Sequence, residues 1–254
     1  MKYDLRGLLA LCLVFVGTDV LAQTHIPAYN TYQTAPFVID DNNGLAVDLV
    51  EYLNERLKGK YSITLQNIPR VRLNQLVIAD PDFEGIVLLL NPAFVDDAEK
   101  SKYFWTAAII ADKNNVVSPL SKPIEYHNPD SLQGKRFVGI KDHRYAGLDD
   151  RFGVDIKRFD INTELAMLKT VALNRADVTV LAALTYNYLM KSYGADEGLN
   201  GKLYVSTTPH RHFDRYMFVS RKDAALSKEL SAVAQAMPND PAWKAILAKY
   251  GAKD

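Results

Sequence analysis

The sequence has little cysteine, no excess of either charge and no hydrophobic run long enough to cross a membrane. Its one cysteine is Cys12, so no disulfide framework stabilises the chain. Thirty basic residues balance 30 acidic ones, which argues against nucleic acid as a partner, because phosphate binding relies on a basic surface. With 13 glycines and 11 prolines, collagen and low-complexity disorder are excluded. Apolar residues still form 48% of the chain, enough for a substantial core.

The first 22 residues have the pattern of a secretory signal peptide. Lys2 and Arg6 precede an apolar run over residues 7–17, and a Val-Leu-Ala segment ends at Ala22. The run is much shorter than the roughly 20 residues needed to cross a bilayer. This favours cleavage after Ala22 over the alternative, an uncleaved membrane anchor. We therefore expect a periplasmic protein that contains no cysteine after cleavage and is not inserted in the membrane.

Apolar periodicity predicts alternating helices and strands from residue 45 onward. Residues 45–57 have one apolar helical face, residues 61–65 alternate as in a strand, and residues 71–77 repeat the helical spacing. The apolar run GIVLLL at 85–90 then predicts a buried strand. This order is typical of α/β layers around a mostly parallel sheet.

The same pattern restarts after the polar stretch 118–130. It predicts strands at 136–140, 177–181 and 203–206, and helices at 162–173 and 184–193. A last helix begins at Asp240-Pro241, has an apolar face that includes Trp243, and ends at Gly251. The chain is therefore predicted to be an α/β protein with two units of similar size.

Six segments occur in an order that matches a known family. They are Pro36-Phe37, GLAVDLVEYLNERL, SLQGKRFVGI, ELAMLKTVALNRADVTVL, RYMFVSRKD and DPAWKAILAKYG. Through these segments, residues 36–251 resemble the bacterial extracellular solute-binding proteins of family 3, the amino-acid type of periplasmic binding protein.

The resemblance implies a two-lobe, periplasmic-binding-protein-like (type II) fold with two crossing strands as a hinge. Residues 23–117 and 209–254 are expected to form lobe 1, and residues 118–208 lobe 2. A small-molecule ligand is expected between the lobes, which close around it. We expect a monomer that holds no metal and no cofactor.

The sequence departs from the family at the residues that grip an amino acid. Where amino-acid binders of the family have an arginine for the ligand carboxylate, this chain has Asp97 or Ala98. Where they have an aspartate for the ligand ammonium, it has Ala182, and Asn91 stands where a hydroxyl residue is usual. We therefore expect a small polar or anionic, amino-acid-like metabolite rather than an ordinary α-amino acid.

Other side chains on the predicted ligand loops could replace the missing charges. Arg70 and Arg72 open the second helix, where an anion would also gain from a helix N-terminus, although a solvated helix start explains them as well. Aromatic residues would supply walls, or belong to the core. The candidate ligand residues are Tyr32, Arg70, Arg72, Asn91, Trp105, Asp142, His143, Arg144 and Tyr145.

The histidines, and the absence of enzyme motifs, indicate no other chemistry. His210 and His212 could form a metal pair, but without a nearby carboxylate or cysteine cluster a loop position is the better interpretation. His143 could sense pH, lie behind the ligand residues or simply lie on the surface. The sequence has no G-x-S-x-G, HExxH or Walker motif, so an enzyme is not expected, although scattered acids leave an acid/base pair open.

Three functions remain as hypotheses. The first is a periplasmic solute-binding protein that delivers its ligand to an ABC permease. The second is a ligand-sensing accessory protein that docks on a chemoreceptor or sensor kinase. The third is an enzyme built on the same fold.

Overall fold

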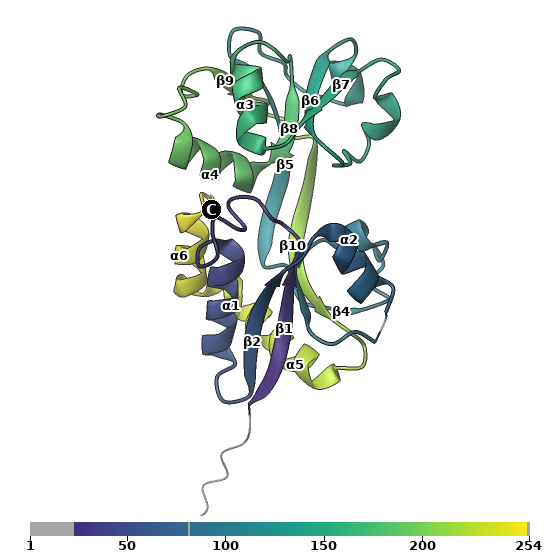
Figure 1. Cartoon of the computed structure of the whole chain (residues 1–254), viewed down its shortest axis with the longest axis vertical. Helices are drawn as coiled ribbons and strands as arrows, with labels where there is room; N and C mark the ends of the chain where they lie inside the picture. The colour runs from purple at the N-terminus through teal and green to yellow at the C-terminus, as the bar shows by residue number, and fades with distance from the viewer. Residues whose placement is uncertain (1–22, 81, 253–254) are drawn as a thin grey trace, which may run out of the picture.

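The computed structural model describes residues 23–80 and 82–252, which form two lobes joined by two long strands (Figure 1). The predicted signal peptide lies outside the described residues. The strands are β1 Thr24–Asn30, β2 Tyr61–Asn67, β3 Ile86–Leu90, β4 Phe104–Trp105, β5 Ile110–Pro119, β6 Arg136–Ile140, β7 Lys157–Ile161, β8 Thr179–Ala182, β9 Leu203–Val205 and β10 Arg211–Val219. The α-helices are α1 Leu45–Arg56, α2 Arg70–Leu73, α3 Glu164–Ala172, α4 Ala183–Tyr193, α5 Ala224–Ala236 and α6 Pro241–Lys249.

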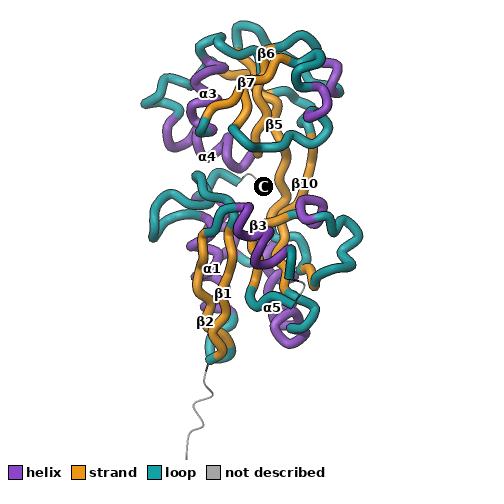
Figure 2. The backbone as a smooth tube through the Cα atoms, turned by 45° about the vertical axis from the view of Figure 1, so that its right-hand side comes forward, coloured by secondary structure: helices purple, strands orange, loops and turns teal. Residues whose placement is uncertain are grey.

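Strands β5 and β10 cross between the lobes side by side (Figure 2). They pair antiparallel from Arg211 opposite Asn114 to Arg215 opposite Ile110. The lower lobe in Figure 1 contains the parallel strands β2, β1 and β3, with β10 antiparallel to β3. The upper lobe contains the parallel pair β6 and β7, together with β8 and β9, which pair with the upper part of β5.

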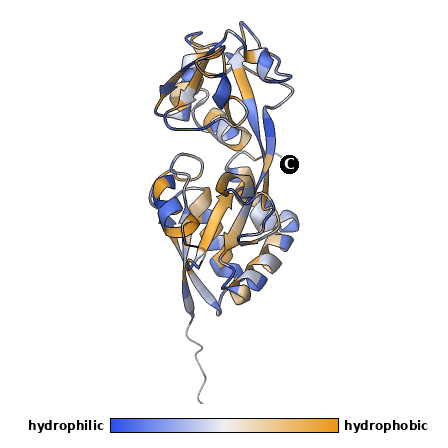
Figure 3. Ribbon diagram, turned by 90° about the vertical axis from the view of Figure 1, so that its right-hand side faces the viewer, coloured by the Kyte–Doolittle hydropathy of each residue, from blue (hydrophilic) through white to orange (hydrophobic). Residues whose placement is uncertain are grey.

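Most predicted elements are confirmed, with small shifts at their ends. Helix α1 buries Leu45, Leu49 and Leu53, one face at a spacing of four residues. All five residues of β3 are buried, as the run GIVLLL predicts. Figure 3 shows hydrophobic strands between the helices of the lower lobe. The second helical pattern is confirmed over its length, but only its first turn, α2, is α-helical, and Asn74–Ile78 forms a π-helical turn. Helix α5 and strand β7 were not predicted.

The lower end of the crossing pair is fixed by α6. Asp240 caps this helix through the amide of Ala242, as the Asp-Pro signal predicts. Trp243 is 1% exposed, and its indole Nε1 donates to the carbonyl of Ile109, 3.0 Å away, at the residue before β5. The last helix therefore anchors the start of the first crossing strand.

The upper end of the pair is fixed by a carboxylate. Glu125, which follows β5, accepts hydrogen bonds from the hydroxyls of Thr207 and Tyr204 and from the amides of Thr207 and Thr208, which precede β10. The hydrogen bond from Thr207, followed by that from Tyr204, lowers the pKa of Glu125 from 4.5 to about 2. The two chain segments that enter the upper lobe are thus joined by one side chain.

This carboxylate makes the protein sensitive to acid. Because its pKa is depressed in the folded state, Glu125 contributes stability that is fully present above pH 4.5 and is lost as the pH falls toward about 2. We expect Glu125→Gln to lower the melting temperature at pH 7 and to flatten its decline over that pH window. Melting curves recorded by circular dichroism at a series of pH values measure both effects. The matched control is Glu229→Gln, at an exposed ion pair with Lys60, and equal losses in the two variants would contradict the assignment.

Candidate functional site

The strands of both lobes end at the junction between them. Strand β3 is antiparallel to β10 and parallel to β1, so both β1 and β3 run toward the upper lobe. Strand β8 is antiparallel to β5 and therefore runs toward the lower lobe, and β6 runs with it through the parallel bridge of Phe137 with Val178. Ligands of open α/β sheets bind beyond the carboxyl ends of strands. The loops that follow these four strands are therefore the candidate site.

The loop after β1 is held by Asn30. The Asn30 side chain donates to the carbonyl of Tyr32 and to Asn67, and its oxygen accepts from the Tyr32 amide. The ring of Tyr32 stacks on Phe37 with 4.5 Å between centroids. The structure thus places the predicted aromatic residue Tyr32 at the junction, with its ring against a second aromatic side chain.

A buried ion pair lies beside these rings. Arg215 on β10 and Asp112 on β5 are each 2% exposed and lie 2.8 Å apart. The Arg215 guanidinium also lies 4.8 Å from the Tyr32 ring and 4.7 Å from the Phe37 ring. This pair was not predicted from the sequence. An isolated buried charge is costly and needs a partner, and the partners here lie about one hundred residues apart in the chain, so neither residue indicates the other.

Arg215 also supports an unusual backbone conformation at the end of β3. Leu89 has a φ of 64°, a region that leucine rarely adopts. The Arg215 guanidinium donates to the Leu89 carbonyl at 3.5 Å. Such conformations persist where the surroundings fix them, and they cluster at functional sites. The buried arginine therefore links the crossing strands to the loop that follows β3.

Two of the predicted ligand residues hold that loop. Asn91 accepts from the amide of Ala93 and donates to the carbonyl of Asp214, while Arg70 donates to the carbonyl of Phe94 and to Asn74. The structure thus brings Arg70 and Asn91 to the same turn. Arg72 lies on the exposed side of α2. A ligand role for any of the three stays a prediction.

Asp97, one of the two residues at the predicted arginine position, is a structural carboxylate. It is 2% exposed and accepts from the indole of Trp105 at 2.7 Å and from the amides of Ser101 and Lys102. Burial acts to raise the pKa of Asp97, but these hydrogen bonds outweigh it and lower that pKa below its usual value. The Trp105 ring packs against Phe218 with 4.4 Å between centroids. Trp105 therefore contributes to the lower-lobe packing, and a ligand role for it stays a prediction.

In the upper lobe, Tyr145 is a core residue. It is 5% exposed, and its hydroxyl accepts from the Ile140 amide at 3.0 Å. Burial raises the pKa of Tyr145 to about 12. Arg158 on β7 lies over the ring and donates to the carbonyls of Ile140 and His143, so it holds the loop that contains the other predicted residues. Arg158 was missed because β7 was not predicted.

The rest of that loop is exposed. Asp142 has a φ of 61°, His143 contacts the edge of the Tyr145 ring, and the Arg144 side chain is 89% exposed, with Asp149 at 3.7 Å. An exposed guanidinium this weakly paired is available to a ligand anion. Among the loop residues, Arg144 is thus the one whose placement fits the predicted role best.

Among the hydrogen bonds that join the two lobes, one lies at these loops. The Thr34 hydroxyl, in the loop after β1, donates to the carboxylate of Glu164 at 3.0 Å. Glu164 is the first residue of α3, and burial raises the pKa of its carboxyl. Neither residue was predicted from the sequence, because neither belongs to a motif.

The described residues, 23–80 and 82–252, contain no group of three or more His, Cys, Asp or Glu side chains placed to share a metal ion. His210 and His212 have separate surroundings. The ring of His210 pairs with the Tyr126 hydroxyl at 2.9 Å and the Ala146 carbonyl at 3.0 Å, whereas His212 lies opposite Lys113 on the crossing strands. Within the same part of the chain, no helix is long and apolar enough to span a membrane.

Solved structures share this arrangement, although no family model and no curated protein matches the chain. An ancestral cationic amino acid solute binding protein has a TM-score of 0.66 and 15% identity over 90% of this chain and 96% of that chain. The GluR0 ligand-binding core from Nostoc punctiforme, in complex with (L)-glutamate, has a TM-score of 0.64 and 12% identity over 89% of this chain and 98% of that chain. The B. pertussis BvgS periplasmic domain has a TM-score of 0.66 and 17% identity over 90% of this chain and 42% of that chain. The predicted two-lobe, periplasmic-binding-protein-like fold is confirmed.

Proposed function

We propose that this chain is a periplasmic solute-binding protein that captures a small polar or anionic metabolite between its lobes. One observation carries the proposal: strand ends of both lobes converge on a junction that β5 and β10 cross side by side. A ligand that contacts both lobes binds the closed arrangement better than the open one, and that difference in affinity drives closure. The closed form would then deliver the ligand to an ABC permease.

The two fixed ends of the crossing pair support hinge closure. Trp243 holds the lower end, Glu125 holds the upper end, and the Asp112–Arg215 pair lies between them. Bending is then confined to the paired segments, residues 110–114 and 211–215. The division predicted from the sequence, with residues 23–117 and 209–254 in lobe 1 and residues 118–208 in lobe 2, stays our proposal. We also propose that the protein acts as a monomer without enzymatic activity.

The test is ligand-induced stabilisation of the chain without residues 1–22. A library of amino acids, carboxylates and amines should contain a compound that raises the melting temperature. At one hundred times Kd, such a ligand adds about 2.7 kcal/mol to the free energy of unfolding. If no member of the library stabilises the protein, the proposal fails.

Arg144 is the residue whose replacement we expect to weaken ligand binding. We expect Arg144→Ala to weaken binding of an anionic library hit by about 2 kcal/mol, because charge-assisted hydrogen bonds contribute about 1.5–3 kcal/mol. Isothermal titration calorimetry measures the change. Arg175→Ala, an exposed arginine after α3, is the matched control and should bind normally. Unchanged affinity in Arg144→Ala would contradict the ligand role.

A sensory role is the second candidate. The similarity to the BvgS periplasmic domain and the missing amino-acid clamp favour it. In this case the closed form would dock on a chemoreceptor or sensor kinase. Permease and ATPase genes beside this gene would favour transport, whereas a lone or signalling-linked gene would favour the sensor.

A further inference from the structure

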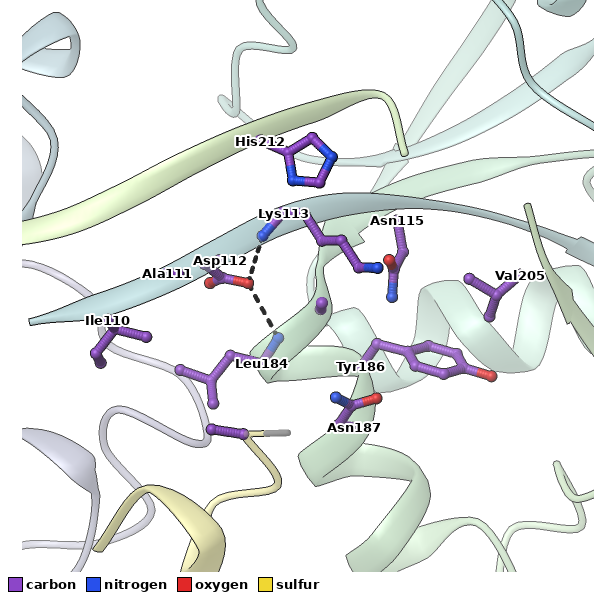
Figure 4. Close-up of a pocket in the computed structure, with 12 residues that line it drawn as sticks. Ile110, Ala111, Asp112, Lys113, Asn115, Leu184, Tyr186, Asn187, Val205 and His212 are labelled. Atoms are coloured by element: carbon purple, nitrogen blue, oxygen red, sulfur yellow. Dashed lines mark hydrogen bonds between the residues drawn. The ribbon is translucent and has the colours of Figure 1, made fainter. Parts of the chain in front are cut away.

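A cavity of about 440 Å³ lies against the crossing strands, beside α4 (Figure 4). Lys113, Asn115 and His212 of the crossing strands line it, as do Tyr186 and Asn187 of α4. Ala252, which follows α6, completes the wall from the lower lobe. The volume is that of a small-molecule site. None of the candidate ligand residues predicted from the sequence lines this hinge cavity.

The hinge cavity is distinct from the junction around Tyr32. Side chains alternate between the two faces of a strand, so Lys113 and its cross-strand partner His212 face away from the side of Phe213 and Arg215. Arg215 packs on Tyr32 and Phe37 on that other side. Asp112 reaches the edge of the hinge cavity, but its carboxylate is already engaged by Arg215 and by the amide of Leu184.

A carboxamide without a protein partner borders the hinge cavity. Asn115 is 5% exposed, and within the described part of the chain its side chain makes no hydrogen bond. Figure 4 shows this side chain pointing into the space between Lys113 and Tyr186. A group that fills the hinge cavity covers this amide and must then hydrogen-bond to it, because buried polar side chains are nearly always hydrogen-bonded.

The neighbouring groups define the chemistry of that occupant. The Lys113 ammonium has no ion pair and the Tyr186 hydroxyl no hydrogen bond among residues 23–80 and 82–252. Together with the Asn115 amide they offer one positive charge and several donors, while the one carboxylate at the edge, Asp112, is neutralised by Arg215. Carboxylates match this set best, because they accept several hydrogen bonds and carry the opposite charge.

We propose that the hinge cavity binds a small carboxylate-bearing metabolite at a second site, on the face of the crossing strands opposite to Tyr32 and Phe37. Its occupant touches the crossing strands, α4 of the upper lobe and Ala252 of the lower lobe. Asn187 already donates to the carbonyl of Gly251 at 3.0 Å, so the two lobes meet at this wall. A carboxylate bound here therefore favours the lobe arrangement in which α4 lies against the C-terminal segment.

The experiment titrates the chain without residues 1–22 with acetate, succinate and citrate by calorimetry, with succinamide as the uncharged control. At least one carboxylate should bind, and succinamide should not. Lys113→Gln and Asn115→Asp should each raise Kd at least about tenfold, since each removes a charge-assisted contact or adds a repelling charge. Lys122→Gln, at an exposed lysine outside the hinge cavity, should leave Kd unchanged.

Arg144→Ala separates this site from the proposed function. Carboxylate binding that survives Arg144→Ala and is lost in Lys113→Gln supports the hinge cavity, even if no ligand of the junction is found. Failure of all three carboxylates to bind, equal binding of succinamide, or loss in Arg144→Ala with no change in Lys113→Gln would overturn it. Because Lys113 is exposed, Lys113→Gln keeps the test valid if Asn115→Asp fails to fold.

Discussion

Replacing Asp112 with alanine lowers the free energy of unfolding by about 3–5 kcal/mol, because it leaves the Arg215 guanidinium buried without its counter-charge. Both side chains are 2% exposed, so water cannot replace the lost partner. The amide of Leu184, at the start of α4, loses its acceptor as well. Urea unfolding followed by circular dichroism measures the change.

Two controls distinguish the loss of a buried counter-charge from the loss of a charged side chain elsewhere. Removing both charges together, as Asp112→Leu with Arg215→Met, should cost less than Asp112→Ala alone, since no unpaired charge remains and methionine suits the aromatic surroundings. Glu229→Ala breaks the exposed pair with Lys60 and should cost less than about 1 kcal/mol. If Asp112→Ala lowered the free energy of unfolding by less than about 1 kcal/mol, the burial of the pair would be contradicted.

Trp243→Ala is the second variant with a large expected effect. The side chain is 1% exposed, contacts the Tyr52 ring with 5.6 Å between centroids and donates to the Ile109 carbonyl. Truncation creates a large cavity and should cost about 3–5 kcal/mol. Because α6 anchors the start of β5 through this residue, the loss should also loosen the lower end of the hinge. Urea unfolding measures the loss of stability. Amide hydrogen exchange at Ile110 measures the loosening at the start of β5.

Trp243→Phe separates packing from the hydrogen bond. It retains an aromatic ring but leaves the Ile109 carbonyl without its donor, which should cost about 1–3 kcal/mol. If the phenylalanine variant were as unstable as Trp243→Ala, the hydrogen bond would account for the anchoring and the packing would not.

Elements with a continuous apolar pattern could be predicted from the sequence. Helix α1 and strand β3 each present one strong period, and the structure places both within a residue or two of the prediction. Strand β7 was not predicted, because none of its residues is fully buried and only two of the five, Phe159 and Ile161, are apolar. Helix α5 could have been, since Asp223 caps it and Leu226, Leu230 and Ala234 form a buried stripe.

The candidate site was less predictable, because its contacts join residues far apart in the chain. Strand order indicated which loops meet, and Tyr32 and Arg144 lie on those loops. Tyr145 was placed on the correct loop, but its ring faces the core, and loop position alone does not determine the direction of a side chain. Two pairs form only when the chain folds: Asp112 with Arg215, and Thr34 with Glu164.

The most direct test of hinge closure is the distance between the lobes with and without ligand. Val71 in the lower lobe is 69% exposed and Val154 in the upper lobe is 82% exposed, so both can be replaced by labelled cysteines. Without residues 1–22 the chain has no other cysteine. Single-molecule energy transfer should show a shift to a shorter inter-lobe distance when the library hit is added. An unchanged distance at saturating ligand would contradict hinge closure.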